Sequence, residues 1–384
     1  MDFKMNKLLK KMMVVLLSLG LVQAVWADDV LDFKETLQAA DQGNAKAQFY
    51  LGGMYYKGEG VRQDYKQAVQ WYRKAAEQGV AEAQYNLGVM YAQGQGVHQD
   101  DTQAVQWFRK AAEQGYAEAQ YNLGVAYANG RGGFRQDDAQ AVQWYRRAAE
   151  QGYAGAQVNL GLMYEQGQGV RQDYAQAVQW YRKAAEQGDA EAQLNLGMMY
   201  LNGQGVRQDD AQAAGWFLKA AEQGDVNAQY NLGLMYDNGL GFRQDDAQAV
   251  QWYRRAVEQG LAGAQYSLGV KYLNGQGVRQ DDAQAAGWFL KAAEQGYAKA
   301  QYNLGLMYAK GQGVRQDDVQ AVQWYRKATE QGLADAQYNL GVMYLNGKGI
   351  RQNYKTAKEW FSKACDNELQ QGCDAYRKLN QAGY

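Results

Sequence analysis

The stretch AEAQYNLGVMYAQGQGV, residues 81–97, decides the fold, because nearly the same phrase recurs along almost the whole chain. Its Leu-Gly pair returns in nine related phrases, and every interval between them is 36 residues except one of 37. One extra residue in the loop NGRGGFRQDD of the third copy explains the longer interval. The leucines of these pairs are Leu51, Leu87, Leu123, Leu160, Leu196, Leu232, Leu268, Leu304 and Leu340. A fixed period of this length is typical of a repeat architecture rather than of separate globular domains.

Each repeat has the pattern of two helices joined by a glycine-rich turn. Ala83, Leu87, Met90 and Tyr91 recur at spacings of four and three residues, so they share one face of a first helix, which we call helix A. The glycines of GQG end helix A, and a second helix, helix B, begins near Asp100. Neither helix can bury its apolar face alone, whereas stacked hairpins bury a continuous core.

An Asp-x-x-Gln pattern at the start of helix B predicts a capping box. In such a box the Asp and Gln side chains each accept a hydrogen bond from the other residue's backbone N–H and so satisfy two orphan N–H groups. The pairs are Asp64/Gln67, Asp100/Gln103, Asp137/Gln140, Asp173/Gln176, Asp209/Gln212, Asp245/Gln248, Asp281/Gln284 and Asp317/Gln320. In the ninth repeat IRQNYKT replaces the box.

Composition supports an all-α fold. The chain contains 45 glycines and no proline, so nothing in it forces a helix interior to break. Gly88 and its equivalents fall inside helix A, where Gly costs about 1 kcal/mol relative to Ala. Because this glycine returns in all nine repeats, we expect a neighbouring helix to approach it too closely for a side chain. The sequence thus predicts an all-α solenoid of nine helix-turn-helix repeats.

The N-terminus is typical of an export signal. MDFKMNKLLKK is basic, MMVVLLSLGLVQAVW is apolar, and Val25 and Ala27 occupy the −3 and −1 positions of a cleavage site. An uncleaved membrane anchor is the alternative. We expect a signal peptide over residues 1–27, a capping helix over 28–44, the repeat array over 45–364 and a C-terminal capping segment over 365–384. The mature chain would begin at Asp28 in the periplasm or outside the cell, with no integral membrane span.

The phrases A-x-A-Q-Y-N-L-G-x-M-Y, G-x-G-V-x-Q-D and A-V-x-W-Y-x-K-A-A-E-Q-G resemble the Sel-1-like repeat family, relatives of the tetratricopeptide repeats. The resemblance implies a right-handed superhelix of α/α hairpins whose A helices line the concave side. It also implies a scaffold or adaptor, often in bacterial envelope processes or in contact with host cells. The family frequently has proline where this chain has VRQDD, a departure that should not disturb the fold.

The resemblance extends to the two cysteines, Cys365 and Cys373, in CDNELQQGC. Their spacing is similar to that of helix-bridging disulfides in the cysteine-rich branch of the family. It implies a disulfide that joins the end of the last helix B to the capping helix. Two free buried thiols are the alternative.

Residues that could carry chemistry are few. His98 is the only histidine and stands where most copies have Arg, and Ser267 stands where most copies have Asn. The Asp-Asp pairs fit helix capping better than calcium binding, and the glycine-rich loops lack a phosphate-binding ending. A net charge of −1 without a basic patch argues against nucleic acid. We expect no catalytic residue, metal or cofactor, and a monomer that binds a protein or peptide. The alternative is an envelope enzyme, or a regulator of one, that acts on cell wall or β-lactams.

A helical wheel assigns the recognition surface to the side of helix A that carries Glu82, Tyr85 and Val89, with Asn86 at its flank. Asn amides could hold the main chain of an extended peptide, and tyrosines could add flat contacts. The groove candidates are Asn86, Asn122, Asn159, Asn195, Asn231, Asn303, Asn339, Tyr85, Tyr121, Tyr230 and Tyr302. The alternative is that these side chains bond only between neighbouring repeats.

Overall fold

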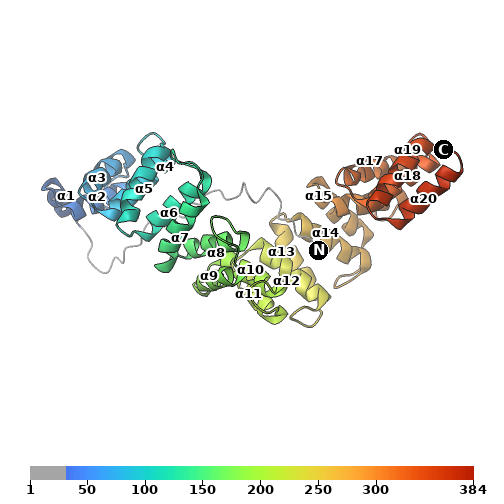
Figure 1. Cartoon of the computed structure of the whole chain (residues 1–384), viewed down its shortest axis with the longest axis horizontal. Helices are drawn as coiled ribbons and strands as arrows, with labels where there is room; N and C mark the ends of the chain where they lie inside the picture. Colours follow the sequence, from blue (N-terminus) through green and yellow to red (C-terminus); the bar gives the residue numbers. More distant parts are fainter. Residues whose placement is uncertain (1–31) are drawn as a thin grey trace. The chain divides into compact units, whose positions relative to one another are not determined.

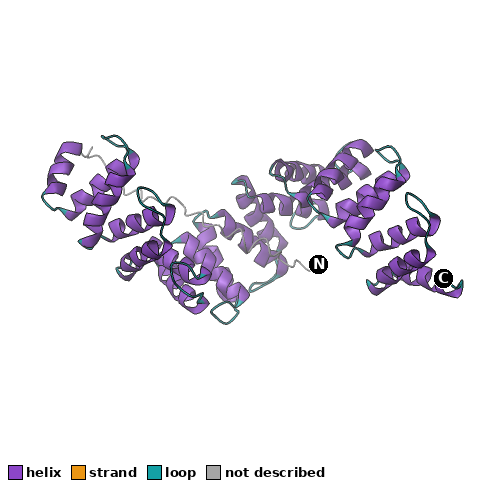
Figure 2. Cartoon of the chain, turned by 90° about the horizontal axis from the view of Figure 1, so that it is seen from above, coloured by secondary structure: helices purple, strands orange, loops and turns teal. Residues whose placement is uncertain are grey.

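A computed structural model describes residues 32–384, and every regular element in that range is an α-helix (Figures 1 and 2). The predicted all-α array of nine helix-turn-helix repeats is confirmed. Contacts divide the chain into two compact units within helix α9, unit 1 ending at Trp180 and unit 2 starting at Tyr181. The predicted signal peptide and its cleavage site lie outside the described residues. No helix in the range 32–384 is long and apolar enough to cross a membrane.

From α2 to α19, even-numbered helices are the A helices and odd-numbered helices are the B helices. Unit 1 contains α1 (Phe33–Asp41), α2 (Ala45–Lys57), α3 (Tyr65–Glu77), α4 (Ala81–Gln93), α5 (Asp101–Glu113), α6 (Ala117–Asn129), α7 (Asp138–Glu150), α8 (Ala154–Gln166) and the first part of α9 (Tyr174–Glu186). Unit 2 contains the rest of α9, α10 (Ala190–Asn202), α11 (Asp210–Glu222), α12 (Val226–Asn238), α13 (Asp246–Glu258), α14 (Ala262–Asn274), α15 (Asp282–Glu294), α16 (Ala298–Lys310), α17 (Asp318–Thr329), α18 (Ala334–Asn346), α19 (Tyr354–Asp366) and α20 (Gln370–Gln381). Within each unit, a helix packs mainly against the helices before and after it in the chain.

The turn from helix A to helix B follows one design, which the third repeat modifies with one extra residue. Gly94 ends α4 in the left-handed conformation, with φ of +68°, and the chain then turns back to start α5. The Asp100 carboxylate accepts from the Gln103 backbone N–H at 3.0 Å, as predicted for the first half of the capping box. The second half is wrong, because the Asp100 N–H donates to the Tyr91 carbonyl of helix A at 3.0 Å instead. The cap therefore ties helix B to the end of helix A.

The glycine inside helix A marks a close approach, as predicted. A methyl group at Gly88 would lie 2.7 Å from the ring of Phe108 in helix B of the same repeat. Phe108 is a buried aromatic residue, and so is the equivalent residue in each of the other repeats. A glycine in the turn is similarly constrained, since a methyl group at Gly277 would lie 2.2 Å from the Asp246 carbonyl of the preceding repeat. Glycine thus fixes the distance both within and between hairpins.

A ladder of buried glutamines, which was not anticipated, crosses the repeat boundaries. The Gln84 amide donates to the Ala76 carbonyl of the preceding helix B at 3.0 Å and accepts from the Gln114 amide at 2.8 Å. A buried amide without partners would cost about 1–3 kcal/mol, so each rung favours one arrangement of neighbouring repeats. The buried amides of this ladder are Gln48, Gln84, Gln120, Gln157, Gln193, Gln229, Gln265, Gln301 and Gln337.

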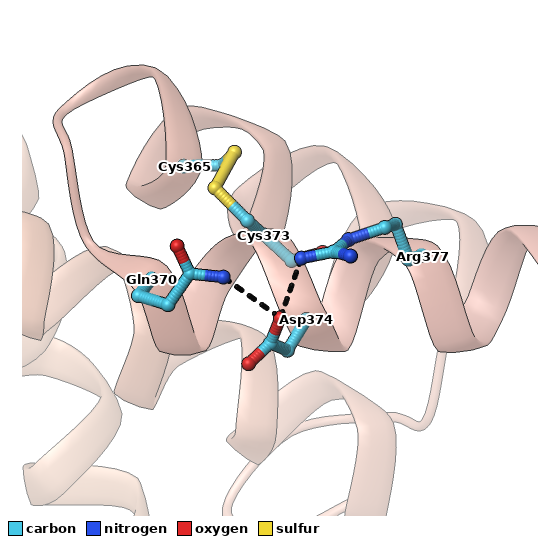
Figure 3. Close-up of a disulfide and its surroundings, with 5 residues drawn as sticks. All are labelled: Cys365, Gln370, Cys373, Asp374 and Arg377. Atoms are coloured by element: carbon cyan, nitrogen blue, oxygen red, sulfur yellow. Dashed lines mark hydrogen bonds and ion pairs between the residues drawn. A yellow bond between two sulfur atoms is a disulfide. The ribbon is translucent and has the colours of Figure 1, made fainter.

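The C-terminal end is closed by α20 and by a disulfide. Cys365 near the end of α19 is bonded to Cys373 in the first turn of α20, with 4.5 Å between their Cα atoms, so the predicted pairing is confirmed (Figure 3). Asp374 beside it accepts from Gln370 at 2.9 Å and from Arg377 at 2.6 Å. A terminal helix has a neighbour on one side only, and the disulfide holds it against α19.

Candidate binding surface

One position of helix A stays open to solvent in both units and differs from repeat to repeat. It directly precedes a fully buried alanine such as Ala83. Its occupants are Lys46, Glu82, Glu118, Gly155, Glu191, Asn227, Gly263, Lys299 and Asp335, and each is exposed or half-buried. Charge and size vary here, whereas the neighbouring alanines, leucines and glutamines hardly vary. Within each unit the array therefore presents a changing row of side chains on a constant framework.

A second row runs beside it and is aliphatic. Val89 in α4 is half-buried, and each equivalent residue from α6 to α18 is also half-buried. In unit 1 the row continues as Val125 and Leu162, and in unit 2 it consists of Met198, Leu234, Val270, Leu306 and Val342. These side chains pack partly against the core and leave the remaining surface to solvent. Together with the preceding row they form what we call the A-helix surface of each unit.

The tyrosine candidates lie deeper than the helical wheel implied. Tyr85 is 5% exposed, and its ring lies 5.7 Å from Phe108 and 5.2 Å from Tyr116 between ring centroids. Tyr121, Tyr230 and Tyr302 are half-buried and lie 5.9–6.1 Å from the equivalent helix B rings. Tyr85 thus belongs to the core, while the other three keep an exposed part.

Most of the asparagine candidates donate to tyrosine hydroxyls of the preceding repeat. Burial raises the pKa of Tyr72, and the hydrogen bond from Asn86 opposes that rise. Asn122 bonds Tyr85, and Asn159 bonds Tyr145, in the same way. In unit 2, Asn303 bonds Tyr266, and Asn339 bonds Tyr302 and Tyr325. These contacts are of the kind that the alternative interpretation, bonding between repeats, requires.

Asn231 differs from the other asparagines whose contacts the structure shows. Its amide reaches the Met198 sulfur at 3.7 Å, and a thioether is a weak acceptor. Asn195 is half-buried in α10. The binding role of the asparagines and tyrosines stays a prediction, and Asn231 is the position at which it can be tested with least effect on stability.

The B helices present a different surface, on which cations contact neutral aromatic residues. The Arg146 guanidinium donates to the Tyr164 hydroxyl of the next helix A at 2.7 Å, and the same bond recurs in repeats of both units. Leu218 and Leu290 replace the arginine in two repeats. At the residue directly after the arginine position, Lys110 lies 4.0 Å from the centroid of the Trp107 ring, a cation–π contact that also recurs.

An open pocket of about 830 Å³ lies beside the Arg146–Tyr164 bond in unit 1. Its wall combines the Trp180 ring with Arg171, Glu150 and Asp173, so charges of both signs are present. The Asp173 carboxylate already caps α9 through the Gln176 N–H at 3.0 Å. The arrangement offers contacts for a polar partner but no nucleophile paired with a base.

Residues 32–384 contain no cluster of three or more His, Cys, Asp or Glu residues placed to hold a metal ion. His98 is exposed in its loop. Ser267 bonds the Tyr230 and Tyr253 hydroxyls within the array rather than a base.

Comparisons with known proteins agree with this geometry. The family model described as Sel1 repeat matches nine segments, residues 45–80, 81–116, 117–153, 154–189, 190–225, 226–261, 262–297, 298–333 and 334–369. The chain is 40% identical to a protective antigen present in uropathogenic Escherichia coli strains, described as displaying an SLR fold. That match covers 91% of this chain and 82% of that one, with a TM-score of 0.68. A Sel1 repeat protein from Oxalobacter formigenes is 38% identical over 81% of this chain and 89% of its own, with a TM-score of 0.62. No curated protein matches the chain.

Proposed function

Because the chain belongs to the Sel1 repeat family, we propose that it is a non-enzymatic scaffold that binds a protein or peptide along the A-helix surface. The observation that carries the proposal is the contrast between the varied exposed row, from Lys46 to Asp335, and the constant buried framework around it. If the exposed positions served only to hold neighbouring repeats together, we would expect them to be as constant as the packing residues. The half-buried aliphatic row supplies apolar area, and the varied row supplies selectivity.

We also propose that the scaffold works outside the cytoplasm, in the bacterial envelope or in contact with a host. The basic and apolar N-terminal sequence supports export, and the Cys365–Cys373 disulfide suits an oxidising compartment. The similarity of the chain to a protective antigen of uropathogenic Escherichia coli supports a role in contact with a host. Mass spectrometry of the protein recovered from cells should find Asp28 as its first residue, whereas an intact Met1 would contradict export.

Asn231→Ala, combined with Asn227→Ala, should weaken partner binding without lowering the melting temperature appreciably. Asn227 is exposed and Asn231 has only a weak contact, so neither truncation opens the core. Losing hydrogen bonds of about 1 kcal/mol each should reduce affinity about fivefold or more. The partner is first captured with the mature chain as bait, and its affinity for each variant is then measured by calorimetry.

Two controls separate recognition from packing. Asn339→Ala removes the bonds to the half-buried Tyr302 and the buried Tyr325 and should lower the melting temperature. Arg326→Ala changes the B-helix surface and removes the bond that Arg326 donates to the Tyr344 hydroxyl of α18 at 2.9 Å. Undiminished affinity in the Asn227/Asn231 variant together with weakened binding in Arg326→Ala would move the binding site to the B helices.

A further inference from the structure

The junction between the sixth and seventh repeats contains a buried ion cluster in the position where other repeats have an apolar contact. Lys271 in α14 occupies the core position filled by Met235 and Met307 in the adjacent repeats, and its side chain is 3% exposed. Its ammonium group pairs with Asp237 of α12 and with Asp246 at the start of α13, the latter at 2.8 Å. A buried ammonium needs such partners, because an unpaired charge in a protein interior is strongly unfavourable.

The network continues through two further residues. The Tyr253 hydroxyl of α13 donates to the second oxygen of Asp237 at 3.1 Å. Ser267 of α14 bonds the hydroxyl of Tyr253, one turn before Lys271 on the same helix. The cluster thus joins both helices of one repeat to helix A of the next.

Three members of the network depart from the repeat at their own positions. Asp237 stands where the adjacent repeats have Leu201 and Leu273, Ser267 where they have Asn231 and Asn303, and Lys271 where they have methionine. These departures occur in an array whose helices otherwise have closely similar sequences. Residues 201–224 and 273–296 are identical, so α11 and α15 offer the same surface to a following helix A.

Helix α13 begins with the same four residues, DAQA, as α11 and α15, so similar B-helix surfaces also allow repeats to pair out of order, within one chain or between two chains. If α14 packed against α11 instead of α13, Lys271 would still be buried but would face Leu201 in place of Asp237. The ammonium would lose one of its two carboxylates, and Asp237 would lose its cation. A buried charge that is satisfied only in the correct pairing disfavours the incorrect one, as polar residues do in coiled-coil cores.

We propose that Asp237, Ser267 and Lys271 form a network, which we call the register key, that favours packing of the seventh repeat against the sixth over packing against any other repeat. The key selects the order of assembly rather than adding net stability, because replacing a buried ion cluster by apolar residues is often neutral or stabilising. This proposal does not depend on the proposed binding function, and its test uses no partner.

The test compares a single and a triple substitution in the full chain. Asp237→Leu alone leaves Lys271 with one carboxylate and should lower the melting temperature by about 5 °C. Adding Ser267→Asn and Lys271→Met restores the residues of the adjacent repeats and should return the melting temperature to the parent value or above it.

The triple variant should nevertheless assemble less faithfully. After dilution from denaturant at increasing protein concentration, light scattering on a sizing column should find several-fold more dimeric and misassembled material than in the parent. A triple variant that melts lower than the parent, or does not fold, would show that the cluster is a stabilising element only. A triple variant that refolds to the same single species as the parent at every concentration would also overturn the proposal.

Discussion

Gly197→Ala should destabilise the array by about 2 kcal/mol, although alanine is the better helix former. A methyl group at Gly197 in α10 would lie 2.6 Å from Cε1 and 2.7 Å from Cδ1 of Phe217 in α11. Phe217 is fully buried, so its ring cannot move away without disturbing the core. The expected loss is that of an overpacked interior, reduced by the gain in helix propensity. Equilibrium denaturation, with hydrogen exchange of α10 and α11, measures it.

The same hairpin contains a matched control. Gly215 lies within α11, and a methyl group there would meet no atom within 4 Å. Gly215→Ala should therefore stabilise the protein by up to about 1 kcal/mol. Combining Gly197→Ala with Phe217→Leu should cost less than the sum of the two single changes, because both act on one contact. A Gly197→Ala protein as stable as the Gly215→Ala protein would contradict the close-packing explanation.

The sequence predicted the fold well because the same residue pattern occurs nine times along the chain. A single Gly88 in a helix pattern would be ambiguous, but the same glycine at nine fixed intervals indicated a close helix approach, and the Phe108 ring is found there. The start of each helix B was predicted for a similar reason, since Asp-x-x-Gln is a local signal and its hydrogen bond is local.

Contacts that depend on another helix were harder to predict. The Asp100 N–H bonds the Tyr91 carbonyl in another helix, and no local pattern distinguishes that partner from the Gln103 side chain. The buried glutamines were missed because Gln usually lies at the surface, whereas Gln84 is satisfied by the Ala76 carbonyl of the preceding repeat and by the Gln114 amide at the end of helix B of its own repeat.

The candidate surface was predicted only in part, for a geometric reason. A helical wheel divides a helix into one buried and one open side. Helix A lies between its own helix B and adjacent repeats, so it buries two faces. Glu82 was placed correctly on the open side, whereas Tyr85 packs on Phe108 and Tyr116. The ion cluster of Lys271 was not predicted either, because its partners come together only after the hairpins stack.

Raising the pH above about 10 should destabilise the array steeply. Tyr72, Tyr145 and Tyr325 occupy one position of helix B and are 2–3% exposed, and burial raises the pKa of each well above its ordinary value. Below pH 10 these tyrosines are neutral in both the folded and the unfolded chain, so pH has no effect through them. Above pH 10 the unfolded chain releases their protons and the folded chain does not. Each tyrosine should then lower the free energy of unfolding by about 1.4 kcal/mol per pH unit.

Phenylalanine at the same position in other repeats provides the test, since Phe108, Phe217, Phe289 and Phe361 fill it without a hydroxyl. A variant with Tyr72, Tyr145 and Tyr325 all changed to Phe should resemble the parent at pH 8, apart from the lost hydrogen bonds. Between pH 10 and 11.5 its free energy of unfolding should fall less steeply than the parent's, by about 4 kcal/mol per pH unit, because three titrating groups are removed. Denaturant titrations at several pH values measure both slopes. Equal slopes in the two proteins would mean that the buried tyrosines do not control alkaline unfolding, and that other titrating groups set the limit.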